Sequence, residues 1–150
     1  MKRKRTLIAA IATLGLLASA GGAMAFWHRG GHGMKIEKMK KFIDFRLNDM
    51  LDDLEADAGQ RDRIFAVKDG LVQSAEQVFE GRGELHTALL DQWSTEKPDA
   101  ATVHRLIDER IDELRGLAHQ AADAGLQLHG ILTPKQRAAV AQQVRERTQR

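Results

Sequence analysis

Cysteine is absent from this 150-residue chain, tyrosine is absent too, and all aromatic residues together make up only 5 %. Without cysteine there is no disulfide, no thiolate nucleophile and no thiolate metal site. Stability must therefore come from packing alone. No alternating, strand-like run occurs, and no glycine-rich loop follows a strand to hold phosphate. These absences favour an all-α protein and argue against several common classes of enzyme.

Acidic residues are absent before Glu37, and the first segment reads as an export signal. Four bases open the chain, an apolar run covers residues 6–17, and small residues lead to Ala23-Met24-Ala25. This order is typical of a secretory signal peptide, so we expect cleavage after Ala25 and a periplasmic location. The alternative is an uncleaved anchor, because residues 6–27 carry no charge and about 20 residues can span a bilayer. The Ala-, Gly- and Ser-rich second half is poor for an anchor, so we expect no stable membrane insertion.

Removal of the signal changes the charge of the chain. The full chain has 23 Lys+Arg and 21 Asp+Glu. Cleavage leaves 19 bases against 21 acids, a net charge of −2 with neutral histidines. The basic pI therefore belongs to the signal, and a nucleic-acid partner is not supported. The remaining length fits one domain, which we place at residues 35–150 after a Gly/His-rich tail at residues 26–34.

The tail contains a pattern that can bind a metal. Cleavage after Ala25 would give a new terminus, Phe26-Trp27-His28. A free amine, two backbone amides and an imidazole in third place can surround Cu(II) or Ni(II) with four nitrogens in a plane. His28 and His32 are therefore the candidate ligands for Cu(II), Ni(II) or Zn(II), although the fold requires no cofactor. The alternative is an incidental histidine in a tail.

Helical periodicity begins at Lys35. One apolar stripe recurs at steps of three and four: Ile36, Met39, Ile43, Leu47, Met50, Leu51 and Leu54. Phe42 and Phe45 lie off this stripe, on the far side of the helix beside Lys38 and Lys41. Either these four residues form a binding surface, or the rings pack on a neighbouring helix or on a dimer partner.

Two long helices and a short one are predicted to follow. A single register from Ile64 to Trp93 passes through Gly81 and Gly83, and predicts one long helix weakened at the glycines. Residues 94–99 form a turn, and a second stripe then runs from Val103 to Leu132. Its small residues, Ala118, Ala121 and Gly125, would let a facing helix approach closely. The short turn predicts a long antiparallel hairpin, followed by a short terminal helix.

Two helix-start signals frame this hairpin. In Leu132-Thr133-Pro134-Lys135-Gln136-Arg137, Thr133 can cap the last helix while Gln136 reaches back to the Thr133 N–H, and Pro134 occupies the first helical position. A degenerate copy lies upstream, with Asp57 as the cap and Gln60 three residues later. We expect Asp57, Gln60, Leu132, Thr133 and Gln136 to be structural.

The Leu-Thr-Pro-x-Gln-Arg corner, its earlier copy and the export signal together resemble the LTXXQ-motif family. This family comprises periplasmic Spy/CpxP-like chaperones and their heavy-metal-resistance relatives. The resemblance implies a cradle-like, all-α fold of about four helices that forms an antiparallel homodimer. It implies an ATP-independent stress chaperone for unfolded or damaged proteins, with Lys38, Lys41, Phe42 and Phe45 as our candidates for client binding. The alternative is a periplasmic heavy-metal-binding or metal-sensing protein. A third role is regulation through docking on an envelope-stress sensor kinase.

No spacing typical of a catalytic centre occurs. The paired acids lie where a solvated helix face would place them, so we expect no enzyme activity. His104, His119 and His129 are too far apart on one helix to share an ion. His104 with Asp108 and His119 with Asp123 can each supply two ligands, but such pairs are ordinary polar contacts on exposed helices.

Overall fold

The structure is a computed structural model that describes residues 36–148, and these residues contain helices and turns but no strand. The elements are α3 (Ile36–Asp53), α4 (Ala58–Glu80), α5 (Arg82–Ser94), α6 (Ala100–Ile131) and α7 (Pro134–Thr148). The all-α prediction is confirmed, including the long antiparallel hairpin and the short helices at either end. No helix among these residues is long and apolar enough to cross a membrane.

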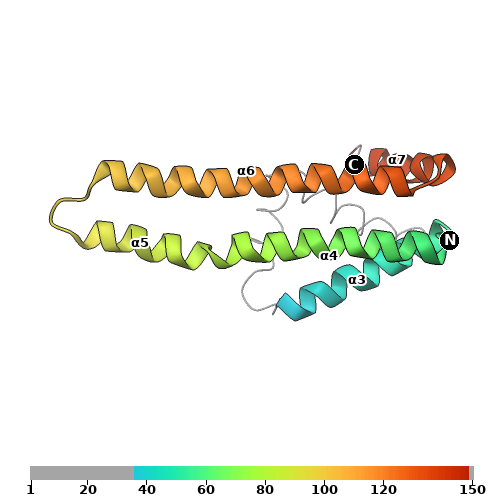
Figure 1. Ribbon diagram of the computed structural model, residues 1–150, viewed down its shortest axis with the longest axis horizontal. Coiled ribbons are helices and arrows are strands. Elements are labelled where there is room, and N and C mark those ends of the chain that lie inside the picture. The colour runs from blue at the N-terminus through green and yellow to red at the C-terminus, as the bar shows by residue number, and fades with distance from the viewer. Residues whose placement is uncertain (1–35, 149–150) are drawn as a thin grey trace.

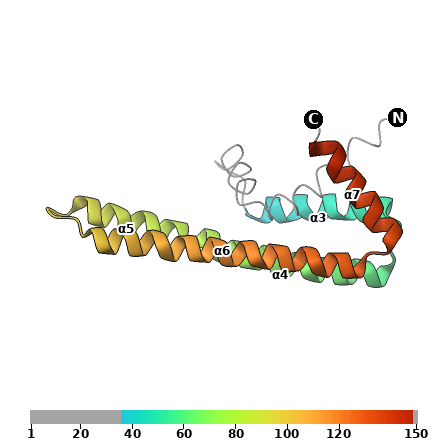
Figure 2. The ribbon, with the colours of Figure 1, turned by 90° about the horizontal axis from the view of Figure 1, so that it is seen from above.

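The molecule is elongated, with the hairpin as its base (Figure 1). α4 and α5 run in nearly one line, and α6 returns beside them along their whole length. Figure 2 shows α3 and α7 on the same side of the hairpin, above the half that lies away from the 94–99 turn. In the outer half of the hairpin, the two helices therefore lie side by side as a single layer.

The core is concentrated where α3 and α7 cover the hairpin. One buried cluster joins α3 to the start of α4, with side chains from the end of α6 and from α7 packed against it. Leu47, Leu51 and Ile64 are its most deeply buried side chains. Each contributes about 1.5–3 kcal/mol by leaving water. A second cluster lies between α4 and α6 and contains Leu71 and Leu117.

The prediction of one uninterrupted helix to Trp93 is wrong at Gly81. The chain makes a turn there that separates α4 from α5. Arg110 of α6 supplies a physical reason, because its Nη1 donates to the Val78 carbonyl at 2.5 Å. That carbonyl would otherwise accept from the N–H four residues later in the helix. Glycine adds little resistance to a break, because it has low helix propensity.

The second predicted stripe is rotated relative to the observed contact face. Leu117, Ala121 and Ala124 are the buried residues of α6. A Cβ at Gly125 would meet no atom within 4 Å, so this glycine does not serve a close helix approach. Trp93 ends the first predicted stripe and Ile107 lies within the second, but both side chains are exposed, Trp93 at 84 %. Among residues 36–148, no third helix covers the hairpin near its turn.

Candidate functional site: paired corners and an exposed helix face

The first corner connects α3 to α4 through two caps in succession. Ala56 N–H donates to the Leu51 carbonyl and Glu55 N–H to the Asp52 carbonyl, both at 3.0 Å. Glu55 has φ 52°, so this is a left-handed helix C-cap of the kind that usually contains glycine. Asp57 then caps α4, accepting from Gln60 N–H at 2.8 Å, while Gln60 Oε1 accepts from Asp57 N–H at 3.2 Å. The predicted capping box is present.

The second corner has the same construction. Thr133 Oγ1 accepts from Gln136 N–H at 3.3 Å, and Gln136 Oε1 accepts from Thr133 N–H at 2.8 Å. Leu132 ends α6 as its C-cap, and its side chain packs against the core cluster. Pro134 begins α7, where its missing N–H has no helical partner to lose.

The two capping glutamines bind each other. Gln60 Nε2 donates to Gln136 Oε1 at 2.9 Å, and Gln136 Nε2 donates to Gln60 Oε1 at 3.1 Å. The remaining donor of each amide reaches a carbonyl of the opposite corner, from Gln60 to Ile131 at 2.9 Å and from Gln136 to Leu54 at 3.0 Å. Each side chain thus makes four hydrogen bonds, the full capacity of a primary amide.

This glutamine pair is buried, with 5 % of Gln60 and 8 % of Gln136 exposed. It holds the α3–α4 corner against the α6–α7 corner through groups that carry no charge. Neutral amides with every donor and acceptor satisfied have no free group for catalysis, so the arrangement is structural. The sequence indicated two separate capping boxes but not the contact between them. The one signal for the pair was that the same residue, glutamine, follows each capping residue by three positions.

The face of α3 opposite the core presents the four predicted client-binding residues. Phe42 is 44 % exposed and Phe45 is 63 % exposed, so both rings present a large part of their surface to solvent. Lys38 and Lys41 are also exposed, and no ion pair among residues 36–148 includes either of them. The structure therefore brings two rings and two cations together on one solvent-facing surface, which we call the α3 outer face.

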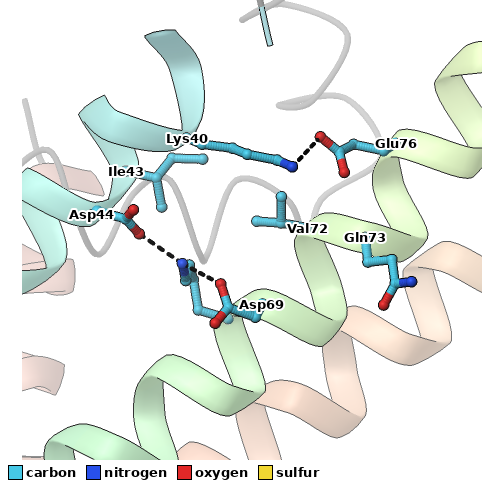
Figure 3. Close-up of a pocket in the computed structure, with 8 residues that line it drawn as sticks. Lys40, Ile43, Asp44, Asp69, Val72, Gln73 and Glu76 are labelled. Carbon is cyan, nitrogen blue, oxygen red and sulfur yellow. Dashed lines mark hydrogen bonds and ion pairs between the residues drawn. The ribbon is translucent and has the colours of Figure 1, made fainter. Parts of the chain in front are cut away.

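A cavity of about 350 Å³ lies between α3 and α4 (Figure 3). Lys40 of α3 pairs with Glu76 of α4 at 2.8 Å, and Asp44 of α3 accepts from Lys68 Nζ of α4 at 2.6 Å. Lys68 also pairs with Asp69. These ion pairs connect the first half of α3 to α4, beyond the apolar cluster that anchors its second half.

The lysines of this cavity stay charged at neutral pH. Burial lowers the pKa of Lys68, but its hydrogen bonds to Asp44 and Asp69 outweigh that effect and the pKa lies above its usual value. The hydrogen bond to Glu76 raises the pKa of Lys40. A raised lysine pKa means that the pairing is complete at neutral pH and is lost only as the pH rises through the folded-state value.

Histidines form no metal centre within the described part of the chain. His86, His104, His119 and His129 are exposed, and no three His, Asp or Glu side chains among residues 36–148 gather closely enough to hold an ion. The predicted ligands His28 and His32 lie outside the described residues. A metal site in the tail therefore stays a prediction from the sequence.

Comparison with known proteins gives one match. A family model described as LTXXQ motif family protein matches residues 42–144, more than half of the chain and both corners. This is the family of Spy/CpxP-like periplasmic proteins. No curated protein and no solved structure matches the chain.

Proposed function

The chain belongs to the LTXXQ motif family, and from this premise we propose that it is an ATP-independent periplasmic chaperone that binds unfolded or stress-damaged proteins. The observation that carries the proposal is the α3 outer face, with Phe42 and Phe45 exposed beside Lys38 and Lys41. Large apolar side chains that gather on one exposed face are typical of a surface that meets another molecule.

The chemistry of the α3 outer face suits weak and promiscuous binding. Each phenyl ring can bury a large apolar area against an exposed side chain of an unfolded protein. The lysine ammonium groups attract acidic segments over several ångströms, and their long stems also cover apolar surface. Neither group needs a particular sequence. Such a surface would slow client aggregation without any catalytic step.

We propose a homodimer on separate grounds. Leu90, Trp93, Ile107 and Ile111 are exposed on the outer half of the hairpin. At about 100° per residue, all four point to the same side of the antiparallel pair, the side that α3 covers further along. A second copy arranged antiparallel would cover this surface in both protomers, as closed two-fold symmetry requires.

The client-binding assignment is tested by replacing both rings with serine. Phe42→Ser/Phe45→Ser should weaken suppression of client aggregation while leaving helix content and the mass of the assembly unchanged. The matched control is Leu126→Ser, which removes an exposed apolar side chain from α6 away from α3. A fall in melting temperature or a dissociated dimer would assign the rings to packing. Equal losses in the variant and the control would remove the α3 outer face from the function.

A second candidate function is metal binding in heavy-metal resistance, and the specific observation in its favour is the sequence Phe26-Trp27-His28. If the export signal is cleaved after Ala25, this segment would offer four nitrogens to Cu(II) or Ni(II), with His32 as a further ligand that also suits Zn(II). Mass spectrometry of the exported protein tests the premise, because the chelate requires Phe26 to be the first residue.

A further inference from the structure

The α3 outer face continues past its two rings toward the end of the helix. Asp49 and Asp53 follow Phe45 by four and eight residues, a spacing that puts them on the same side of α3. Asp53 is exposed and Asp49 is partly exposed. Bases, rings and acids therefore follow one another along one side of the helix. We call this series the bipolar stripe, and it consists of Lys38, Lys41, Phe42, Phe45, Asp49 and Asp53.

The bipolar stripe lies opposite the apolar cluster. Leu47 and Leu51 of α3 are buried in that cluster, at 1 % and 0 % exposed. A step of two residues, from Leu47 to Phe45 or to Asp49, turns by about 200° around the helix. Figure 2 shows α3 on one side of the hairpin, so the bipolar stripe points away from the hairpin.

The charges at both ends of the bipolar stripe have no ionic partner. No ion pair among residues 36–148 includes either lysine or either aspartate of the stripe. Arg46 lies between Phe45 and Asp49 in the sequence, but it is 8 % exposed and is likewise in none of these ion pairs. Both ends are therefore free to pair with charges of another molecule.

Helix stability does not explain the acidic end of the bipolar stripe. The dipole of a helix favours acids near the N-terminus and bases near the C-terminus. The last turn of α3 contains Asp52 and Asp53 and no basic residue. Asp52 pairs with Arg61 of α4 at 2.6 Å, which compensates its charge. Asp53 has no such compensation, and its position at the negative end of the dipole is unfavourable for the helix.

The length of the bipolar stripe matches a short extended peptide. At 1.5 Å per residue, the midpoint of the two lysines lies about 17 Å from the midpoint of the two aspartates. An extended chain advances about 3.3 Å per residue, so five or six residues span roughly this distance. Its side chains alternate between two sides, and those that face α3 between the ends would meet the two rings.

We propose that the bipolar stripe binds extended client segments in which an acidic and a basic residue, about five or six positions apart, flank apolar residues. The inference rests on the proposed chaperone function and names the class of segment that is bound. The client acid would pair with Lys38 and Lys41, its base with Asp49 and Asp53, and its apolar side chains would cover the rings. Either order of acid and base fits, because the client chain can run in either direction along α3.

The probe is a dansyl-labelled peptide, Asp-Ser-Leu-Ser-Leu-Ser-Lys, with glycine spacers and blocked ends. Its control has the same composition, but Asp and Lys are adjacent at one end. The parent protein should bind the first peptide about fivefold to tenfold more tightly at low salt, because exposed ion pairs each contribute modestly. The difference should shrink at 0.5 M NaCl, since salt screens exposed charges.

Reversing the charges of the protein tests which end binds which group. Asp49→Lys/Asp53→Lys should weaken binding of the first peptide about tenfold, because two attractions become repulsions. Its melting temperature should not fall, since lysine is favourable near a helix C-terminus. The matched control is Asp108→Lys/Asp123→Lys, which makes the same change of charge at exposed positions of α6 and should bind as the parent does.

A four-residue reversal gives the sharpest expectation. Adding Lys38→Asp/Lys41→Asp to Asp49→Lys/Asp53→Lys restores the original net charge and reverses the bipolar stripe. Binding of the first peptide should return, because the peptide can bind in the opposite direction. Failure of this variant to regain binding, or equal binding of the two peptides by the parent, would overturn the proposal.

Other outcomes separate the proposal from the chaperone function itself. Unfolding of Asp49→Lys/Asp53→Lys would show that these acids are structural, and self-association lost in that variant would assign the stripe to a second copy; either result overturns the proposal. A parent that suppresses client aggregation but does not distinguish the peptides loses only the charge pattern. If Phe42→Ser/Phe45→Ser binds the first peptide and suppresses aggregation as the parent does, the client site fails as well.

Discussion

Replacing Gln60 and Gln136 by leucine, singly and together, perturbs the contact between the two corners. The Gln136 side chain makes four hydrogen bonds, and so does that of Gln60. At about 1 kcal/mol each, either single substitution should lower the free energy of unfolding by about 4 kcal/mol. That is a large share of the 5–15 kcal/mol typical of a folded domain.

The double variant gives the sharper expectation. Two of the hydrogen bonds join the glutamines to each other, so the double substitution removes six in total, whereas the single effects added together count eight. The double variant should therefore be more stable than additivity requires by about 2 kcal/mol. Each single variant leaves the other glutamine buried without its amide partner, whereas the double variant leaves no such amide. This increases the difference between the double variant and the sum of the single effects.

Urea unfolding at fixed protein concentration measures these values, since dimerisation would make stability depend on concentration. Gln142→Leu is the control, because Gln142 is exposed on α7 and its Nε2 donates to Oε1 of Glu146, one turn along the same helix. It should change stability by no more than about 0.5 kcal/mol. Strictly additive effects of the two glutamine substitutions would refute the reciprocal pair.

Four further predictions concern caps and the terminus. Thr133→Ala should lower the free energy of unfolding by about 1 kcal/mol through loss of the cap, and an activity loss without any stability loss would contradict the structural assignment. Glu55→Gly should raise the free energy of unfolding by about 1 kcal/mol, because Glu55 has φ 52° and glycine adopts a positive φ without steric cost. Unchanged urea unfolding would argue against this backbone conformation. Hydrogen bonds from the Thr102 hydroxyl and from the Thr102 and Ala101 N–H groups lower the pKa of Asp99. The contribution of Asp99 to stability, complete above the usual carboxyl pKa, should therefore be lost as the pH falls through the lowered value, and NMR titration should give Asp99 a pKa below that of an aspartate in an unfolded peptide. Cu(II) should quench Trp27 in a protein that begins at Phe26 but not in His28→Ala or in a protein with one extra leading residue, and equal quenching in all three would exclude the terminal chelate.

The helices and their order could be predicted because apolar residues recur with helical spacing and because both corners contain local capping signals. Leu47, Leu51 and Ile64 lie on the predicted stripes and are the most deeply buried side chains. Capping is a contact between residues three apart, so it can be inferred from adjacent letters. The all-α hairpin follows from such local information.

Contacts between distant residues could not be predicted in the same way. The Gln60–Gln136 pair spans 76 positions, and the Arg110 contact with the Val78 carbonyl spans 32. The apolar register continues unchanged through Gly81, so the break there depends on a guanidinium from another helix. Trp93 fits its stripe by spacing, but its burial would have required a third helix near the turn. These features depend on how the helices are placed relative to one another.

Light scattering tests whether this protein keeps unfolded proteins from aggregating, as proposed. A chemically unfolded client is diluted into buffer without ATP, with increasing amounts of the purified protein, while metal binding is measured on the same sample by calorimetry. We expect scattering to fall in proportion to the protein added, with no metal required, and we expect Phe42→Ser/Phe45→Ser to suppress it less. Unchanged client aggregation together with stoichiometric metal binding would contradict it and assign the protein to the metal-binding branch of the family.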